Sequence, residues 1–431
     1  MKILFIASNR LKRVMPPMPL GLASIIATID ESRHEIRVLD LMFSEQPEAE
    51  LKAVLTDFAP DLIAISVRNI DNQSYLHTEY LLPGIKTLIQ HCQDLSDATL
   101  VIGGPAFTVS PKAIFAYLKP DFGIAGEAEL AFPVLVDRIE GEADCTDLPG
   151  LVWQEPDGVK MNPPEFIEDL DSLPIPRRDL FDNQRYAAER SFGNIVIKQG
   201  CSFRCLYCDS PHTMGSRWRK KSPEKVVDEL EIMQKENGIQ MAFFTDAIFN
   251  TPLDYAEAVC HAIIDRGVKM GWMTTIHPAH VSREFAELMR DAGCVGLSLA
   301  SDSCSEKMLK NLRKDITKED LLSASELLEE MDINYILSFL IGGPGEDRET
   351  VDETIDFVSQ RSPLLADFCV GIRIMPHTAL FDIAVEEGVV APDDPLMEPK
   401  FYVSSLIEDW IVDHLKAACV GHENWSVSHE V

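Results

Sequence analysis

The sequence predicts an α/β protein with two units, each built on a parallel β-sheet. Short apolar runs alternate with helical patterns from residue 1 to about 140, and a second alternation of this kind runs from about 191 to 390. Between them, the chain has a candidate hairpin at 147–157 and a Pro-rich stretch at 173–177, which indicate a stiff connector.

The first unit is expected to be a doubly wound sheet, because each apolar run is followed by a segment with helical periodicity. The expected strands are 3–7, 36–39, 62–67, 99–102 and 122–125, and the expected helices are 20–29, 48–57, 80–91 and 111–118.

Polar residues and glycines follow three of these strands. In doubly wound sheets, ligands bind beyond the carboxyl ends of the strands. Glycine lets a backbone approach a bulky ligand closely, so this edge is the expected ligand site of the first unit. Its candidate residues are Ser66, Arg68, Asn69, Gly103, Gly104, Gly126 and Glu127.

The second unit is expected to form a partial barrel of about six βα units, open on one side. Residues 405–418 in the tail have the pattern of one further helix. The expected strands are 195–198, 241–245, 271–275, 296–299, 334–341 and 369–374, and the expected helices are 223–236, 253–265, 283–292, 318–331 and 348–360.

Three cysteines lie in one loop directly after the first strand of the second unit. Their spacing, Cys201-x3-Cys205-x2-Cys208, suits three irons of a [4Fe–4S] cluster and leaves the fourth iron open for a ligand. A zinc site completed by His212 is the alternative, although zinc sites usually combine two close pairs of ligands. A disulfide framework is not expected, because the other seven cysteines are scattered singly along a long chain.

The carboxyl ends of the other barrel strands also carry special residues, and barrel enzymes place their chemistry there. Each of these residues has an ordinary structural alternative, since an aspartate can cap a helix and a glycine can form a turn. Their common position at the strand ends favours a functional role. The candidates are Asp246, Asn250, Asp302, Gly342, Gly343 and His377.

Composition restricts the partners. A net charge of −31 argues against nucleic acid, whose phosphates would be repelled. The sequence contains no stretch of about 18 or more apolar residues, so no membrane span is expected. The first nine residues resemble a β-strand rather than a signal peptide. Unpaired cysteines beside an oxygen-sensitive cluster suit the reducing cytoplasm.

The cysteine loop, which includes Tyr207, resembles the signature of radical S-adenosylmethionine (SAM) enzymes. Together with the first unit, the chain is similar to the radical SAM family that carries an N-terminal cobalamin-binding domain. The stretch 65–71, with Arg68 after the third strand, resembles the branch of that family that includes tryptophan 2-C-methyltransferase. Four further stretches resemble motifs of the family: 222–229, 244–250, 299–303 and 372–380.

The resemblance implies a fold and a division of the chain. Residues 1–140 would form a Rossmann-like cobalamin-binding domain, and 141–190 the connector. Residues 191–390 would form a partial (β/α)6 TIM-type radical SAM barrel, followed by a short tail at 391–431.

The resemblance also implies three cofactors. Cys201, Cys205 and Cys208 would hold the [4Fe–4S] cluster, whose open iron chelates SAM. The residues at the strand ends of the first unit would bind cobalamin. The SAM pocket would be lined by Tyr207, Asp246, Asn250, Asp302, Gly342 and Gly343.

Arg68 has a special place in this interpretation. The chain has no Asp-x-His-x-x-Gly loop to give cobalt a histidine ligand. A guanidinium stays protonated and cannot act as a ligand, so Arg68 below the corrin ring would exclude water without binding cobalt. The alternative is an ordinary ion pair with Asp71 or another acid.

The implied activity is a cobalamin-dependent methyl transfer from SAM to a carbon of a small metabolite or peptide held between the domains. Arg68, Asp246 and His377 are the residues expected to act in catalysis. A radical and a polar route both stay open. The polar route needs a base, for which His377 and His212 are candidates.

Two other classes of function also stay open. One is a radical SAM enzyme that rearranges its substrate or transfers a 3-amino-3-carboxypropyl group, with or without cobalamin. The other is a zinc-stabilised or redox-sensing module without enzymatic activity. For the enzyme, the expected partners are the substrate, which the acidic surface suggests is cationic or zwitterionic, and a reductase, ferredoxin or flavodoxin as electron donor. Neither nucleic acid nor a membrane is expected as a partner.

Overall fold

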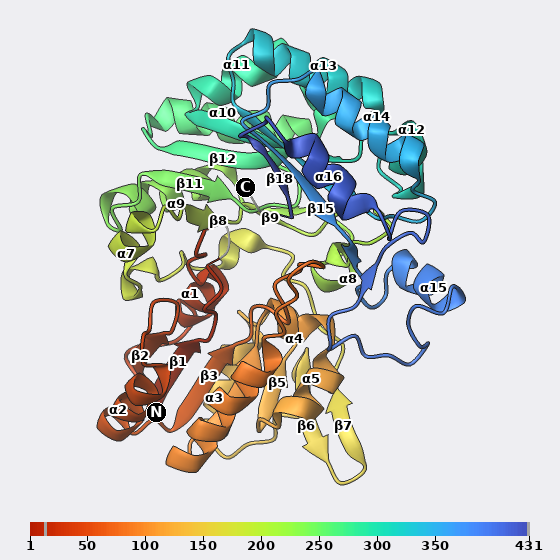
Figure 1. Cartoon of the computed structure of the whole chain (residues 1–431). Coiled ribbons are helices and arrows are strands. Elements are labelled where there is room, and N and C mark those ends of the chain that lie inside the picture. The colour runs from red at the N-terminus through yellow and green to blue at the C-terminus, as the bar shows by residue number, and fades with distance from the viewer. Residues whose placement is uncertain (13–14, 429–431) are drawn as a thin grey trace.

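The computed structural model describes residues 1–12 and 15–428. Figure 1 shows two α/β units, with the first domain below and the second above it. Each is built on a seven-stranded sheet. No helix in the described part of the chain is long and apolar enough to span a bilayer.

The sheet of the first domain has the strand order β2-β1-β3-β4-β5-β6-β7. The first five strands pair in parallel, and the last two form an antiparallel hairpin that is added at the β5 edge. The strands are β1 (Lys2–Ala7), β2 (Glu35–Asp40), β3 (Leu62–Ser66), β4 (Thr99–Gly103), β5 (Phe122–Ile124), β6 (Leu151–Glu155) and β7 (Gly158–Met161).

Helices cover both faces of this sheet, as expected for a doubly wound fold. Successive side chains of β1 point to opposite faces of the sheet, and those of residues 3–7 are all apolar, so both faces need a cover. Ile3 and Phe5 pack with α1 and α6, whereas Leu4 and Ile6 pack with α2, α3 and α5. The short helix α4 begins directly after β4. The helices are α1 (Leu20–Ile26), α2 (Pro47–Phe58), α3 (Leu82–Leu95), α4 (Pro105–Val109), α5 (Pro111–Leu118) and α6 (Ala131–Glu140).

The five strands and four helices expected in the first unit are all present. Helices α4 and α6 were not predicted from the sequence. The hairpin forms a few residues later than expected, with its turn between β6 and β7, and it is hydrogen-bonded to β5. The hairpin therefore extends the first sheet rather than standing apart from it.

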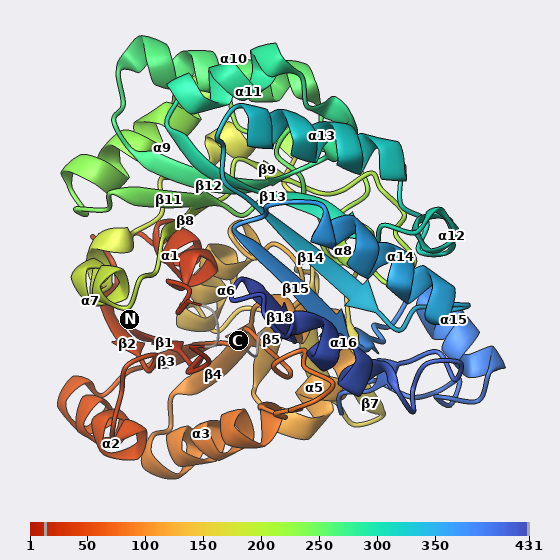
Figure 2. The same cartoon turned by 45° about the horizontal axis from the view of Figure 1, so that its top comes forward.

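The sheet of the second domain is entirely parallel, in the order β18-β15-β14-β13-β12-β11-β8. Its helices cover the outer face, which Figure 2 shows from above. Its strands are β8 (Gly193–Ile195), β11 (Met241–Phe244), β12 (Gly271–Ile276), β13 (Cys294–Asp302), β14 (Tyr335–Ile341), β15 (Leu365–Val370) and β18 (Trp425–Val427). The outer helices are α9 (Pro223–Lys235), α10 (Leu253–Arg266), α11 (Arg283–Asp291), α13 (Lys318–Glu330), α14 (Arg348–Ser359) and α16 (Ile411–Cys419).

Smaller elements complete the chain. Two small antiparallel pairs stand outside the main sheets: β9 with β10, and β16 with β17. They are β9 (Lys198–Gln199), β10 (Arg219–Lys220), β16 (Ile372–Arg373) and β17 (Phe401–Tyr402). The short helices are α7 (Asn183–Ala188), α8 (Ser210–Thr213), α12 (Glu306–Asn311) and α15 (Ala379–Glu386), with 3₁₀ turns at Leu170–Ser172, Arg178–Leu180 and Pro278–His280.

Two barrel strands differ from the prediction. The strand expected at 195–198 is divided, because β8 ends at Ile195 and β9 pairs outside the sheet with β10. The sixth strand lies earlier than expected, since Gly371 (φ +79°) ends it, and a Cβ there would lie 2.6 Å from the Tyr75 side chain. The tail adds both a helix and a seventh strand, β18, beside β15.

Two buried ion pairs join the domains. Asp71, in the loop after β3, accepts a 2.8 Å hydrogen bond from Nε of Arg373 in β16. Glu127, after β5, accepts two hydrogen bonds from Arg219 in β10 and one from the amide of Ile167. Both pairs are almost fully shielded from solvent. They fix the loops at the strand ends of the first domain against the barrel.

We expect Arg373→Met to lower the free energy of unfolding by about 3–5 kcal/mol, because Asp71 would stay buried without its cation. The double variant Arg373→Met/Asp71→Asn should recover part of this loss. Urea unfolding of the single and double variants measures both effects. Arg283→Met is the control: its exposed pair with Glu330 predicts a change within about 0.5 kcal/mol. Equal losses in the two arginine variants would contradict the assignment.

Candidate active site

The three cysteines lie in a loop that the barrel holds at several points. The loop starts at Gly200 (φ +87°), where a Cβ would lie 2.1 Å from the carbonyl oxygen of Arg217. The amide of Cys201 donates to Gly215 O (3.0 Å), and the amide of Leu206 donates to Leu312 O (2.9 Å). The cysteine loop is therefore fixed by backbone contacts at both of its ends.

The three thiols are not gathered tightly in the structure. Within residues 1–12 and 15–428, the sulfurs of Cys201, Cys205 and Cys208 do not all lie within 4.8 Å of one another. A tetrahedral zinc ion with Zn–S bonds of about 2.3 Å would hold its sulfurs about 3.8 Å apart, whereas in a cubane cluster each thiolate binds a different iron.

The thiols of the cysteine loop hold their protons when no metal is bound. Burial raises the pKa of Cys205 to about 11 and raises the pKa of Cys201, so that both thiols hold their protons in the absence of iron. Iron–sulfur ligation removes these protons, since the thiolate is the ligand. His212, the fourth ligand of the zinc alternative, stacks instead on His377, with 4.2 Å between the ring centroids.

One metal-like group of side chains lies elsewhere, at the edge of the first domain. His34, Asp137 and Glu140 come within 4.8 Å of one another. The carboxylates of Asp137 and Glu140 bind the guanidinium of Arg33, and Glu140 also binds the amino group of Met1. These cations already balance the acids, so the group is an ion-pair network.

A large cavity opens between the two domains, with a volume of about 620 Å³. This lies within the range of about 300–1,000 Å³ that is usual for ligand sites. From the barrel, Gln199, Asp209, Thr245 and Met375 contribute to its wall. From the first domain, all seven residues predicted at the strand ends line it: Ser66, Arg68, Asn69, Gly103, Gly104, Gly126 and Glu127.

Arg68 faces this cavity without an acid. Its guanidinium donates to Asn69 Oδ1 (3.1 Å), and no carboxylate of the described residues lies within 4.0 Å of it. The alternative ion pair with Asp71 does not form, because Asp71 binds Arg373. The Arg68 side chain is exposed, but the surface it exposes faces the cavity between the domains. The protein around that cavity still desolvates the guanidinium, which lowers its pKa. Such a cation fits the lower face of a large, flat cofactor.

The chain matches two known families over these two parts. The B12 binding domain matches residues 10–136, and the radical SAM superfamily matches residues 195–358. The chain is a radical SAM protein with an N-terminal B12-binding domain. The two families account for the three cofactors of the prediction: the [4Fe–4S] cluster and SAM in the barrel, and cobalamin in the first domain.

Relatives of this radical SAM protein extend over most of its length. It is 27% identical to an uncharacterised methyltransferase of Pyrococcus horikoshii, over 94% of this chain and 90% of the relative. It is 25% identical to the tryptophan 2-C-methyltransferase of Streptomyces laurentii, over 87% of this chain and 73% of that enzyme. The radical SAM methyltransferase TsrM of Kitasatospora setae, solved with tryptophan and a SAM analogue, is 26% identical with a TM-score of 0.82, over 90% of this chain and 76% of that structure.

Asp302 and Tyr207, two residues of the predicted SAM pocket, meet beside the cysteine loop. The phenol of Tyr207 donates to Asp302 Oδ2, and the same oxygen accepts the Lys314 ammonium at 2.7 Å. Asp302 has a left-handed backbone (φ +59°), and the register of β13 with β14 shifts between Leu299 and Asp302. This irregularity directs Asp302 to the cysteine loop rather than along the sheet.

Two other residues of the predicted SAM pocket, Asn250 and Asp246, hydrogen-bond the backbone at the strand ends. Asn250 is fully buried and bonds the backbone of His277 and His280 through both its oxygen and its nitrogen. Asp246 accepts the amides of Ile197 and Lys198, each at 3.0 Å. Its second oxygen is buried without a partner, and burial raises its pKa to about 6. Both side chains brace the strand ends, because a loop that leaves the sheet frees backbone groups that must be paired.

The glycines Gly342 and Gly343 are bound by a residue that the sequence did not single out. Their amides donate to Glu346 Oε2, at 2.5 and 3.0 Å. The other carboxylate oxygen of Glu346 is buried without a partner, and burial raises its pKa to about 7. A glutamate three residues after two glycines, at the start of a helix, is the signal that could have predicted this contact.

The glycines of the first domain are required by the packing of the chain itself. Gly104 has φ +105°, and a Cβ there would lie 2.8 Å from the carbonyl oxygen of Val67. At Gly126 (φ +86°), a Cβ would lie 2.8 Å from the Pro164 side chain. Both glycines also line the large cavity, so their contact with a ligand stays a prediction.

Two acids in the cavity wall were also not predicted. Glu129 and Asp209 line the cavity, one from each domain, and burial raises the pKa of both carboxyls. No lysine, arginine or histidine nitrogen of the described residues lies within 4.0 Å of either carboxylate. His377 and His212, the predicted bases, are exposed and are absent from the described residues that line the cavity.

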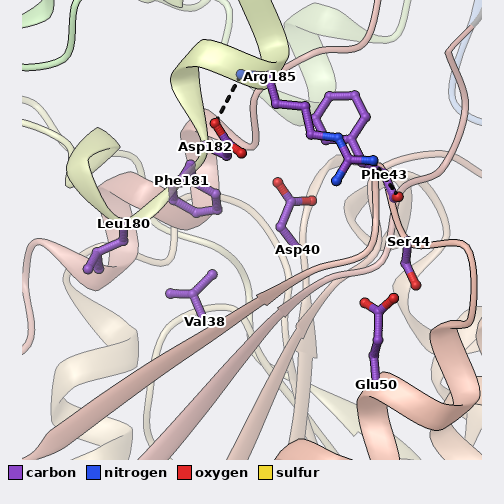
Figure 3. A pocket seen from close by; sticks show the side chains of 9 residues that line it. All are labelled: Val38, Asp40, Phe43, Ser44, Glu50, Leu180, Phe181, Asp182 and Arg185. Carbon is purple, nitrogen blue, oxygen red and sulfur yellow. Dashed lines mark hydrogen bonds between the residues drawn. The ribbon is translucent and has the colours of Figure 1, made fainter.

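A smaller pocket of about 160 Å³ lies at the end of β2 (Figure 3). Asp40 and Arg185 face it, and Arg185 stacks over the Phe43 ring. Asp40 also borders the large cavity, where it accepts a 2.7 Å hydrogen bond from the Tyr186 hydroxyl. Tyr186 lies within electrostatic reach of Arg68, so this network supports the wall of the cavity below Arg68.

The raised pKa of Glu346 predicts a pH-dependent stability. The folded state holds this proton more tightly than the unfolded state, whose carboxyl titrates near 4.5. The free energy of unfolding should therefore fall by up to about 3 kcal/mol as the pH rises from about 4.5 to about 7. Above pH 7 it should stay level.

Glu346→Gln should remove this dependence, because an amide stays neutral while it still accepts the two glycine amides. Urea unfolding at pH 5.5 and pH 8 measures this. The free energy of unfolding of the variant, relative to that of the native chain, should be higher at pH 8 than at pH 5.5. Glu349→Gln, an exposed acid in the first turn of the same helix, is the control and should track the native chain. If the free energy of unfolding of Glu346→Gln depends on pH as that of the native chain does, the assignment is refuted.

Proposed function

We propose that this chain is a cobalamin-dependent radical SAM methyltransferase that moves a methyl group from SAM, by way of cobalamin, to a carbon of a small molecule. The observation that carries this proposal is the position of the cavity. The strand ends of the B12-binding domain form one wall of it, and residues that follow the cysteine loop, such as Asp209, form the other. A substrate held there would lie beside both cofactors.

The residues divide the work between them. When bound, cobalamin supplies a metal that carries the methyl group, and the cluster binds SAM and supplies electrons. The three cysteines hold the cluster in a loop fixed by Gly215 and Leu312. Arg68 lines the cavity beside Ser66 and Asn69, and it would give bound cobalamin a cationic neighbour that cannot act as a ligand.

Relatives support the reaction class and guide the choice of substrate. Two of them are named methyltransferases, and one of these is named for carbon 2 of tryptophan. Glu129 and Asp209 place two carboxylates in the cavity wall, and neither forms an ion pair within 4.0 Å among the described residues. We propose a cationic or zwitterionic substrate on this ground, and tryptophan and other amino acids are the first candidates to test. A reductase, ferredoxin or flavodoxin is the proposed electron donor, and the reducing cytoplasm is the proposed location, since no disulfide joins the cysteines of the described residues.

The test begins with cofactor binding. The full chain, reconstituted anaerobically with iron, sulfide and hydroxocobalamin, should retain about four irons and four sulfides. It should also retain one corrinoid, visible in its absorption spectrum. Cys208→Ala should lose the iron, whereas Cys419→Ala, outside the cysteine loop, should keep it. A chain that binds zinc but no iron–sulfur cluster would exclude the proposal.

The second part of the test measures the transfer. The reconstituted chain is incubated with a reductant, SAM labelled on its methyl group and candidate amino acids, and mass spectrometry follows the products. The proposal expects the gain of one labelled methyl. A product that gains a 3-amino-3-carboxypropyl group, or that rearranges without label, would support the alternative radical SAM reactions instead.

Arg68→Met should change the coordination of cobalt. In the native chain we expect the EPR spectrum of bound Co(II) to show no ligand on the lower face, because the guanidinium occupies that space and cannot coordinate. Methionine is uncharged and has no N–H donor. Without the guanidinium, water should reach the cobalt and add a ligand. Arg37→Met, an ion-paired arginine on β2, is the control and should leave the spectrum unchanged. A ligated spectrum in the native chain would contradict this role.

A further inference from the structure

Lys314 is a buried cation beside the cysteine loop. Its side chain is 9% exposed, and its ammonium lies 2.7 Å from Asp302 Oδ2. Tyr207, within the cysteine loop, bonds the same carboxylate oxygen. A phenol, a carboxylate and an ammonium from three separate segments thus meet at one point, and burial makes their interactions stronger than on the surface.

The backbone explains how Lys314 reaches this place. Arg313 takes a left-handed conformation (φ +55°) just after α12, and the amide of Lys314 returns to Leu309 O at 2.8 Å. This turn presents Leu312 O to the amide of Leu206, at 2.9 Å. The segment after α12 therefore lies alongside the cysteine loop, and Lys314 faces it.

Both charges of this ion pair lie beside the cysteine loop. Tyr207, which stands between Cys205 and Cys208, bonds the carboxylate oxygen that also binds the Lys314 ammonium. The backbone oxygen of Leu312, two residues before Lys314, accepts the amide of Leu206 in the same loop. These two contacts hold the ion pair against the loop that carries the three cysteines.

We propose that Lys314 is a positioning residue that raises the reduction potential of the cluster held by Cys201, Cys205 and Cys208, with Asp302 as its counter-charge; this rests on the proposed function. Reduction adds one electron to the cluster. A fixed cation nearby stabilises the more negative, reduced form, whereas a nearby anion disfavours it. The pair thus sets how strong an electron donor the enzyme requires.

Three variants separate charge from structure. Each is reconstituted as the full chain, its iron and sulfide are counted, and the midpoint potential of its cluster is measured by EPR-monitored titration without SAM. Lys314→Met should shift the potential to more negative values. Asp302→Asn, which removes the anion and keeps Lys314, should shift it to more positive values. Lys310→Met removes an equal charge from the exposed side of α12 and should leave it unchanged.

Opposite shifts in the first two variants are the decisive result, because a loop that merely loosens would not respond to the sign of the charge. Lys314→Arg should stay close to the native potential. Shifts of the same sign, or a Lys314→Met potential equal to that of Lys310→Met, would overturn the proposal. If Lys314→Met fails to retain iron, Asp302→Asn decides: no positive shift overturns it.

The count of iron keeps this test distinct from that of the proposed function. A native chain that binds no cluster overturns both proposals. A native chain with a full cluster and an unaffected potential in the Lys314 and Asp302 variants overturns the role of Lys314 alone.

Discussion

The position of the cavity depends on two buried ion pairs across the domain interface. Arg373 with Asp71, and Arg219 with Glu127, tie the loops after β3 and β5 to the barrel. These are the same loops that carry Arg68 and Gly126. Burying a charge is costly unless its partner is held in place, so each pair favours one relative position of the domains over others. The geometry of a site shared by two domains needs such a constraint.

The ion pairs also explain why Arg68 has no acid partner. Asp71 lies three residues after Arg68 and would be its nearest acid in the sequence, but Arg373 holds it. Glu127, another acid at this edge of the sheet, is held by Arg219. Both carboxylates are thus paired with arginines across the interface, and the Arg68 guanidinium faces the cavity. In a chain with a net charge of −31, this guanidinium is a positive charge in the wall of the cavity.

The sequence was sufficient for the order of strands and helices, because hydrophobic periodicity depends on burial, and burial recurs along both sheets. It was also sufficient for the strand-end residues of the first domain, since the carboxyl ends of parallel strands share one edge. It did not predict β18, whose three residues are too few for a period and whose place beside β15 depends on the fold of the whole tail. It assigned Gly371 to a strand, since periodicity carries no information on a contact with Tyr75 of the other domain.

The barrel residues show which contacts the sequence does not distinguish. Asp246, Asn250 and Asp302 are all short polar residues near the ends of barrel strands, so the sequence gives no reason to separate them. In the structure the first two pair with backbone groups, and only the third turns to the cysteine loop. The difference lies in which backbone groups are left without partners where a strand leaves the sheet, and that is a property of three dimensions. Lys314 and Glu346 were missed for the same reason.

The same physical rule separates scaffold from site in the final structure. Buried polar groups that hold a loop have their partners within the protein, as Glu346 has in the amides of Gly342 and Gly343. Groups that face the cavity have no oppositely charged side chain within 4.0 Å among the described residues, as with Arg68, Glu129 and Asp209. Lys314 stands between these classes: its partner is Asp302, yet the pair lies beside the cysteine loop through Tyr207. A buried ion pair close to a redox centre is therefore more than a structural contact, because its orientation adds to the energy of every electron that the centre accepts.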